Sequence, residues 1–246
     1  MTQQVKIDRG AGISLWRQIA EWLKAEIASG TYAKDARVPT EAEIAARFDV
    51  NRHTVRRAIA ALTNDGILRA DQGRGTYVAS TPLAYPISRR TRFSEIVSAQ
   101  DKTPTGKMTA AAEEEADALI ATQLGVNIGT PLWRIGTLRV VDGFPVLVST
   151  SWLEKARFGN LPEIYDASNS FTECMKQAGV TDYTRKSTKV TAELIEPSDA
   201  IQLGLGEGQP VLVVESVNVG PDGQPVQYTR SRMAADRIQL VIENDG

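Results

Sequence analysis

Hydrophobic residues recur with the period of a helix in three segments near the start of the chain, residues 14–30, 41–48 and 51–66. The third segment has the clearest pattern, and its apolar stripe consists of Val55, Ala58, Ile59 and Leu62. A stripe of this kind marks the side of an amphipathic helix that faces a core. The pattern therefore predicts three consecutive helices that pack together.

Polar residues predict where the second and third helices begin. Thr40 and Glu43 have the spacing of a capping box, in which the hydroxyl and the carboxylate each accept a backbone N–H. Asn51 is the expected N-cap of the third helix, and Gly66 follows its last apolar turn. A short helix, a turn at residues 49–50 and a longer helix together predict a helix-turn-helix.

Two short strands are predicted directly after these helices. Ile67 and Leu68 begin one, Thr76–Val78 forms the other, and residues 72–75 lie at the tip between them. Glycine pairs in hairpins usually serve only to turn the chain. A hairpin directly after a helix-turn-helix nevertheless favours the wing of a winged helix-turn-helix, with a tip that approaches a DNA groove.

The rest of the chain mixes strand patterns with short helices. The dipeptides Asp142-Gly143 and Asp222-Gly223 each stand between two alternating segments, which is a hairpin signal. Residues 113–115, all glutamate, are expected to be the solvated start of a helix that Gly125 ends. No βαβ pattern repeats, so the fold class is predicted to be α+β with a mostly antiparallel sheet.

The domain organisation follows from these patterns. A chain of 246 residues exceeds a typical single domain. Residues 81–86, TPLAYP, contain two prolines and are expected to be an extended linker. We therefore expect a DNA-binding domain of residues 1–80 and a second domain of residues 87–246.

Composition and charge narrow the class of protein. Apolar residues make up 42% of the chain and charged residues 24%, with no run of about 18 apolar residues and no apolar segment near the N-terminus. We therefore expect a cytoplasmic protein that does not contact a membrane. One cysteine and one histidine leave no cluster for a metal, and no cofactor is expected. The net charge is −2, but residues 1–80 hold 12 basic against 9 acidic residues, which leaves them basic.

Cationic and polar side chains crowd the N-terminal half of the third helix, opposite its apolar stripe. This is where a helix in the DNA major groove places the residues that read bases. Arginine pairs with guanine and asparagine with adenine. A solvated basic surface helix is the alternative, and the neighbouring wing weighs against it.

The sequence VPTEAEIAARFDVNRHTVRRAIAALTNDGILRADQGRGTYV, residues 38–78, resembles the N-terminal signature of the GntR family of bacterial transcription regulators. In some members Ala42 is replaced by a DNA-contacting arginine, so Arg57 or Arg74 is expected to carry more of the binding here. The helix face and the resemblance together give the DNA-binding candidates: Thr40, Glu41, Asn51, Arg52, His53, Thr54, Arg56, Arg57, Gln72, Gly73 and Arg74.

The second half resembles the effector domain of the HutC subfamily, which has a chorismate-lyase-like (UTRA) fold. The segments TLRVVDGFPV, LGLGEGQPVLVVES and VQYTRSRM carry this resemblance. RFDVNRHTVRRAI, with YPIS and RTRFSE after the expected linker, is similar to the members that regulate phosphonate utilisation. The resemblance implies a transcriptional regulator, by default a repressor, that binds an inverted-repeat operator as a homodimer and responds to a small anionic effector.

Effector-binding candidates follow in part from chemistry and in part from this resemblance. Arg92, Phe93 and Ser94 open a predicted helix and offer an arginine, a hydroxyl and free N–H groups to an anion. Arg139 is the arginine of the family's R-x-x-D-G pattern; a second arginine two positions earlier is replaced here by Thr137, and Arg134 is expected on the other face of the strand. The remaining candidates are Ser149, Ser151, Glu215, Tyr228 and Arg230.

Three alternatives stay open at this stage. The effector is a phosphonate, a phosphorylated sugar or a carboxylate catabolite, since each fits an anion site. A chorismate-lyase-like enzyme is disfavoured because His53 lies on the expected DNA-reading helix and Cys174 has no histidine in its own domain. A purely structural DNA-binding protein is disfavoured because such proteins need no second domain with a pocket.

Overall fold

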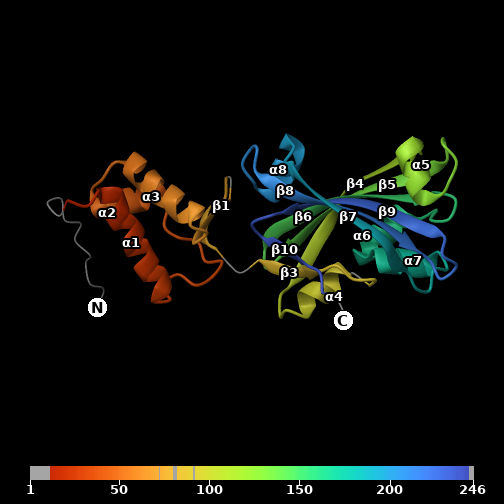
Figure 1. Cartoon of the computed structure of the whole chain (residues 1–246), viewed down its shortest axis with the longest axis horizontal. Coiled ribbons are helices and arrows are strands. Elements are labelled where there is room, and N and C mark those ends of the chain that lie inside the picture. Colours follow the sequence, from red (N-terminus) through yellow and green to blue (C-terminus); the bar gives the residue numbers. More distant parts are fainter. Residues whose placement is uncertain (1–11, 72, 80–81, 91, 244–246) are drawn as a thin grey trace. The chain divides into compact units, whose positions relative to one another are not determined.

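The computed structural model describes residues 12–71, 73–79, 82–90 and 92–243. They form two compact units, of which the first ends at residue 81 and the second contains nearly all of the remainder (Figure 1). The prediction of an α+β fold with a mostly antiparallel sheet is confirmed. Among the described residues, no helix combines the length and the apolar character needed to span a bilayer.

The first unit contains the three predicted helices and the predicted hairpin. The helices are α1 (Leu15–Ala28), α2 (Glu41–Phe48) and α3 (Arg52–Asn64), and the hairpin strands are β1 (Leu68–Asp71) and β2 (Gly75–Val78). The whole predicted stripe of α3 is buried, and it packs in one core with side chains of α1 and α2 such as Leu23 and Ile44.

Local hydrogen bonds explain why α2 and α3 begin where they do. The Glu43 carboxylate accepts the backbone N–H of Thr40 at 2.7 Å, and the Thr40 hydroxyl accepts the N–H of Glu43 at 3.3 Å. The Asn51 side chain accepts the N–H of His53 at 2.9 Å. Between the helices, Asp49 adopts φ +51°, a left-handed conformation that ends α2 and makes the turn tight. The helix-turn-helix is therefore fixed by short-range interactions.

The second unit is built on an antiparallel sheet with the strand order β4-β5-β6-β9-β8-β7. The strands are β4 (Pro104–Glu115), β5 (Pro131–Val141), β6 (Phe144–Glu154), β7 (Thr184–Leu194), β8 (Pro210–Val219) and β9 (Pro225–Ala234). The sheet positions side chains of four central strands side by side. This arrangement creates one continuous face on which a site can be built.

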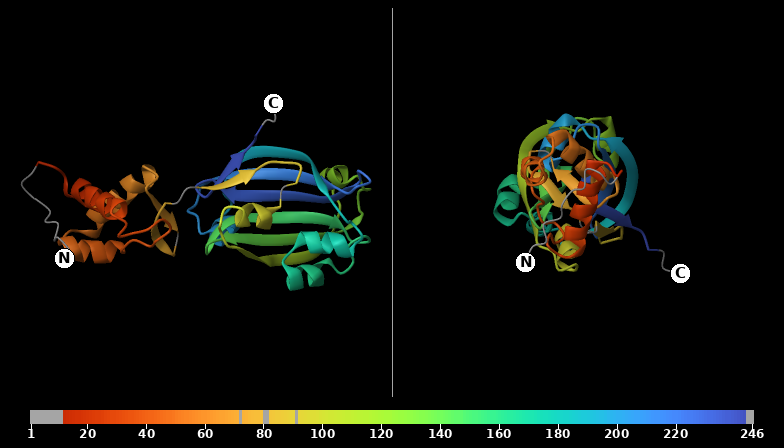
Figure 2. Two further views of the ribbon diagram at one scale, coloured as in Figure 1. Left: turned by 90° about the horizontal axis from the view of Figure 1, so that it is seen from below. Right: turned by 90° about the vertical axis from the view of Figure 1, so that its left-hand side faces the viewer.

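Helices cover both faces of this sheet. α4 (Phe93–Ser98), α6 (Leu161–Ser168) and α7 (Phe171–Gln177) lie on one face, and α5 (Ala118–Leu124) and α8 (Pro197–Leu203) on the other (Figures 1 and 2). On the first face, Tyr165 and Met175 of α6 and α7 pack with Ile135 and Leu153. On the second face, Ile120 of α5 packs with sheet residues such as Leu132 and Tyr228.

The expected linker at residues 81–86 is mostly a strand, so that prediction was wrong. Leu83–Pro86 forms β3, which pairs in parallel with β10 (Ile238–Val241) as a separate two-stranded sheet. The backbone N–H of Leu83 donates to Arg237 and that of Ile87 to Val241, so the odd-numbered residues face β10. The two prolines occupy even positions, where no N–H is needed for this pairing.

One further expectation was wrong, and one helix was missed. Residues 113–115 end β4 and do not start a helix, because they pair with residues 131–133 of β5. Helix α6 was not predicted, although Pro162 in its first turn and Asn169 in left-handed conformation after its last turn are local signals for a helix.

Candidate functional site

The first site is the exposed face of α3. Asn51, Arg52, His53, Arg56 and Arg57 are all exposed, opposite the buried stripe. Arg52, the first residue of the helix, has no hydrogen-bond or ion-pair partner among the described residues. A cationic helix N-terminus with a free guanidinium group is suited to contact phosphates and base edges.

Two of these arginines are oriented by neighbouring side chains. Arg56 donates to both carboxylate oxygens of Glu41, at 3.0 and 2.9 Å, and this hydrogen bonding lowers the pKa of Glu41. The guanidinium of Arg57 lies over the ring of Trp16 at 4.8 Å. The edge of each guanidinium that is not used in these contacts remains available to a ligand.

The wing is held at its base by a buried ion cluster. Arg69, 7% exposed, lies 3.2 Å from the Asp35 carboxylate and 3.4 Å from that of Asp71. At the tip, Gly73 and Arg74 are exposed, whereas Gln72 lies outside the described residues. Gly75 has φ +115°, and a Cβ there would lie 2.7 Å from Arg37 Nε, so this position requires glycine.

The second site is a cavity of about 350 Å³ on the face of the sheet that α4 and α7 cover. Its walls come from α4, the α6–α7 turn, β3 and the start of β7, and its floor comes from four strands of the sheet. This volume lies within the range of small-molecule sites in proteins.

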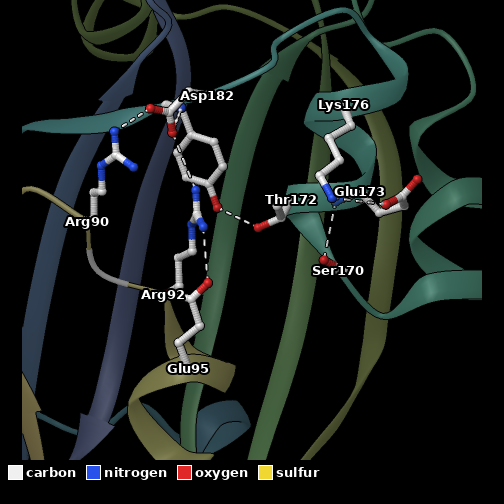
Figure 3. A network of polar contacts seen from close by, with 9 residues as sticks. Arg90, Arg92, Glu95, Ser170, Thr172, Glu173, Lys176 and Asp182 are labelled. Atoms are coloured by element: carbon white, nitrogen blue, oxygen red, sulfur yellow. Dashed lines mark hydrogen bonds and ion pairs between the residues drawn. The ribbon is translucent and has the colours of Figure 1, made fainter. Parts of the chain in front are cut away.

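Three arginines line this cavity: Arg92, Arg139 and Arg185. Arg92 donates to Glu95 at 3.0 Å and to Asp182 at 3.4 Å, and Arg90 lies on the other side of Asp182 at 2.5 Å (Figure 3). The positive charge of Arg92 is therefore largely balanced by these carboxylates.

Arg139 and Arg185 differ from Arg92 because neither has a carboxylate partner among the described residues. Arg139 donates to the side-chain oxygen of Asn169 at 3.1 Å. Nε and Nη1 of Arg185 are buried without a hydrogen-bond partner in the described part of the chain. Buried, unpaired guanidinium nitrogens are costly, and an anion is the kind of ligand whose charge and oxygen atoms can satisfy them.

The comparisons with known proteins identify the family. Residues 15–78 match the bacterial regulatory proteins of the gntR family, and residues 99–239 match the UTRA domain. An uncharacterized HTH-type transcriptional regulator of Rhizobium meliloti is 41% identical over 96% of this chain and 98% of its own length. The chain belongs to the GntR family of bacterial transcriptional regulators.

Other relatives agree with this. The probable transcriptional regulator PhnF of Escherichia coli is 28% identical over 93% of this chain and 95% of its own length. The crystal structure of PhnF from Mycobacterium smegmatis is similar with a TM-score of 0.64 and 25% identity, and the match covers 92% of this chain and 99% of that one.

As a GntR-family regulator with a UTRA domain, the protein binds operator DNA and a small-molecule effector, and it is not an enzyme. His53 is on α3, and burial raises the pKa of the Cys174 thiol to about 11, which keeps it in the unreactive protonated form. The described residues contain no group of three or more potential metal ligands.

The regulator's cavity contains six of the nine effector-binding candidates. They are Arg92, Phe93, Ser94, Arg139, Ser149 and Ser151. Arg134 lies with Arg230 at a different cavity, beside α8, as the odd spacing from Arg139 predicts.

The other three candidates, Glu215, Tyr228 and Arg230, do not line the cavity, so their placement was wrong. On β9, Gln227, Thr229 and Ser231 line it, and the even-numbered residues point to the opposite face. Tyr228 is 3% exposed, stacks on Trp152 and donates to Glu215 at 2.8 Å, while Arg230 pairs with Glu193 at 2.7 Å. Tyr228 is part of the packing under α5, and Arg230 lies beside α8 on the same face of the sheet.

The regulator should lose stability in alkaline solution because of its buried tyrosines. Burial, and then the hydrogen bond to Glu215, raise the pKa of Tyr228 well above its ordinary value of 10.0; burial also raises the pKa of Tyr85 and Tyr165. Above pH 10 the unfolded chain releases these protons first, so the free energy of unfolding falls by about 1.4 kcal/mol per pH unit for each tyrosine. Chemical unfolding between pH 8.5 and 11 measures this. Tyr228→Phe should flatten the decline, and an unchanged slope would contradict the assignment.

Sequence reasoning missed several residues that line the cavity. They are Tyr85, Asn169, Thr172, Tyr183, Arg185, Asn218, Gln227, Thr229 and Ser231. The alternation of β9 offered one signal, since Gln227, Thr229 and Ser231 share a face. Nothing in the sequence indicated that Arg185, at the start of an edge strand, reaches the same cavity as Arg139.

Proposed function

We propose that this GntR-family regulator is a cytoplasmic repressor that binds its operator as a homodimer and releases it when a small anionic effector occupies the cavity. The effector is a phosphonate or a phosphorylated metabolite. The observation that carries this proposal is the pair Arg139 and Arg185, whose guanidinium groups face the cavity without a carboxylate partner among the described residues. The likeness to phosphonate-utilisation regulators supports it.

The DNA-binding part of the proposal rests on the exposed face of α3 and on the wing. Each protomer places α3 in one major-groove half-site, and Arg74 and Gly73 approach the neighbouring groove. A twofold-symmetric dimer then requires an inverted repeat. Thr40 and Glu41 at the start of α2 support the contact, with Glu41 orienting Arg56.

The response to effector is proposed to pass through β3. This strand begins two residues after the boundary between the two units, and Tyr85 in its middle lines the cavity. Arg139 and Arg185 line the same cavity as Tyr85. Effector binding then favours one state of this segment, and its differential affinity for the two states sets the coupling.

Release of operator DNA from the full-length protein tests the proposal. Binding is measured with a series of phosphonates, phosphorylated sugars, inorganic phosphate and carboxylates, and light scattering gives the mass of the protein on DNA. We expect two protomers per operator and release by at least one phosphonate or phosphate ester. Release by none of these anions, or one protomer per operator, would overturn the proposal. Release by carboxylates alone favours the alternative of a regulator that senses a carboxylate catabolite.

A further inference from the structure

The floor of the effector cavity is made almost entirely of hydroxyl and amide side chains. They belong to adjacent strands, and they are Thr137 of β5, Ser149 and Ser151 of β6, Asn218 of β8, and Gln227, Thr229 and Ser231 of β9. Ser149, Ser151 and Gln227 are 8%, 1% and 4% exposed. A sheet face that is covered by helices normally carries apolar side chains, so this polar floor needs an explanation.

The floor residues are paired with one another across the strands. The hydroxyls of Ser149 and Ser231 lie 2.8 Å apart, and those of Ser151 and Thr229 lie 2.9 Å apart. Gln227 donates to Ser151 at 3.1 Å and accepts from Asn218 at 2.9 Å. These contacts hold the side chains in fixed positions across neighbouring strands.

The pairing leaves hydrogen-bonding capacity that faces the cavity. Two hydroxyls joined by one hydrogen bond keep one proton and most of their lone pairs for other partners. The Ser149–Ser231 pair therefore offers both a donor and acceptors to an occupant. An alkyl group placed on this floor would leave buried polar atoms unpaired, whereas a hydroxylated group satisfies them.

We infer that the effector is a phosphate ester with a polyhydroxylated body, such as a sugar or polyol phosphate, and not a simple alkylphosphonate. This inference rests on the proposed function, because it takes the anionic end to be bound by Arg139 and Arg185. The hydroxylated end lies on the floor of β6, β8 and β9. The floor therefore selects a hydroxylated ligand body, and the two arginines select a ligand with an anionic group.

Calorimetric titration of the full-length protein tests this. The probes are glycerol phosphate, ribose 5-phosphate, glucose 6-phosphate and glucosamine 6-phosphate, compared with ethylphosphonate and inorganic phosphate. We expect at least one sugar or polyol phosphate to bind ten times more tightly than ethylphosphonate, since its hydroxyls satisfy groups that the alkyl chain leaves unpaired. If none binds more tightly than ethylphosphonate, the inference fails.

Variants of the floor residues test whether these side chains recognise the sugar phosphate. Ser149→Ala combined with Ser231→Ala removes both partners of one pair, so no buried group is left unpaired, and it should weaken the best sugar phosphate about tenfold while inorganic phosphate changes less than twofold. Ser231→Ala alone is the second variant if the double variant does not fold. Ser187→Ala on the exposed part of β7 is the matched control. Equal binding of the sugar phosphate by the floor variants and the control overturns the inference.

These results separate the two proposals. If phosphonates bind and release the operator as well as any sugar phosphate, the repressor function stands and only the ligand class is wrong. If no anion binds the cavity and none releases the operator, the proposed function itself fails.

Discussion

Replacement of Arg139 by alanine should abolish the effector response and leave operator binding unchanged. Arg139 Nη1 donates to the Asn169 side chain at 3.1 Å, and its guanidinium lies 5.7 Å from each of the rings of Phe93 and Tyr165. These contacts fix a charged group that has no carboxylate partner in the described part of the chain. The group is therefore held in place for an anion.

The size of this effect follows from the hydrogen bonds that are lost. Each hydrogen bond between a guanidinium and an anion contributes about 1.5–3 kcal/mol, which corresponds to roughly tenfold to more than a hundredfold in affinity. Loss of the whole guanidinium should therefore raise the effector concentration for half-release of the operator by at least about a hundredfold. Dose-response curves of operator release measure it.

Arg134→Ala is the matched control for this variant. Arg134 lies on the same strand, five residues earlier, but on the opposite face of the sheet, where its Nε is 3.7 Å from Glu114. It loses the same charge and should leave the dose-response curve unchanged. If Arg139→Ala and Arg134→Ala respond alike to effector, Arg139 does not belong to the binding site.

Replacement of Arg52 by alanine is expected to have the largest effect on operator binding. Arg52 is exposed at the first position of α3, and no hydrogen bond or ion pair with another described side chain holds it. A bidentate contact between arginine and guanine is worth about 1–3 kcal/mol of discrimination against the wrong base. The variant should therefore bind its operator more weakly and also prefer it less over other sequences.

Competition between the operator and a scrambled duplex of the same length distinguishes two roles. Loss of affinity for the operator alone indicates base reading, whereas an equal loss for both duplexes shows that Arg52 contacts phosphate. Lys24→Ala is the control: it removes a positive charge from the same unit, but Lys24 pairs with Asp65 at the other end of α3, 3.5 Å away. This variant should leave both affinities nearly unchanged.

Much of the local structure was predictable because short-range interactions determine it. The capping box of Thr40 and Glu43, the N-cap Asn51 and the turn at Asp142-Gly143 act over two to four residues, and each element begins or ends where they indicate. That Ser149 and Ser151 share one face of β6 was also predictable, since residues two apart on a strand point to the same side. The family resemblance gave the position of Arg139 on β5.

The tertiary structure alone decided which residues share the proposed effector cavity. Arg139 and Arg185 are 46 positions apart on non-adjacent strands, and no local pattern relates them. It also decided which face of β9 forms the floor of the cavity. Alternation of side chains along a strand defines two faces, but it does not show which face borders a cavity. The pairing of β3 with β10 was hidden for the same reason: a parallel partner some 150 residues away gives the TPLAYP segment no local signature, and only the folded chain turns that segment into a strand that lines the cavity.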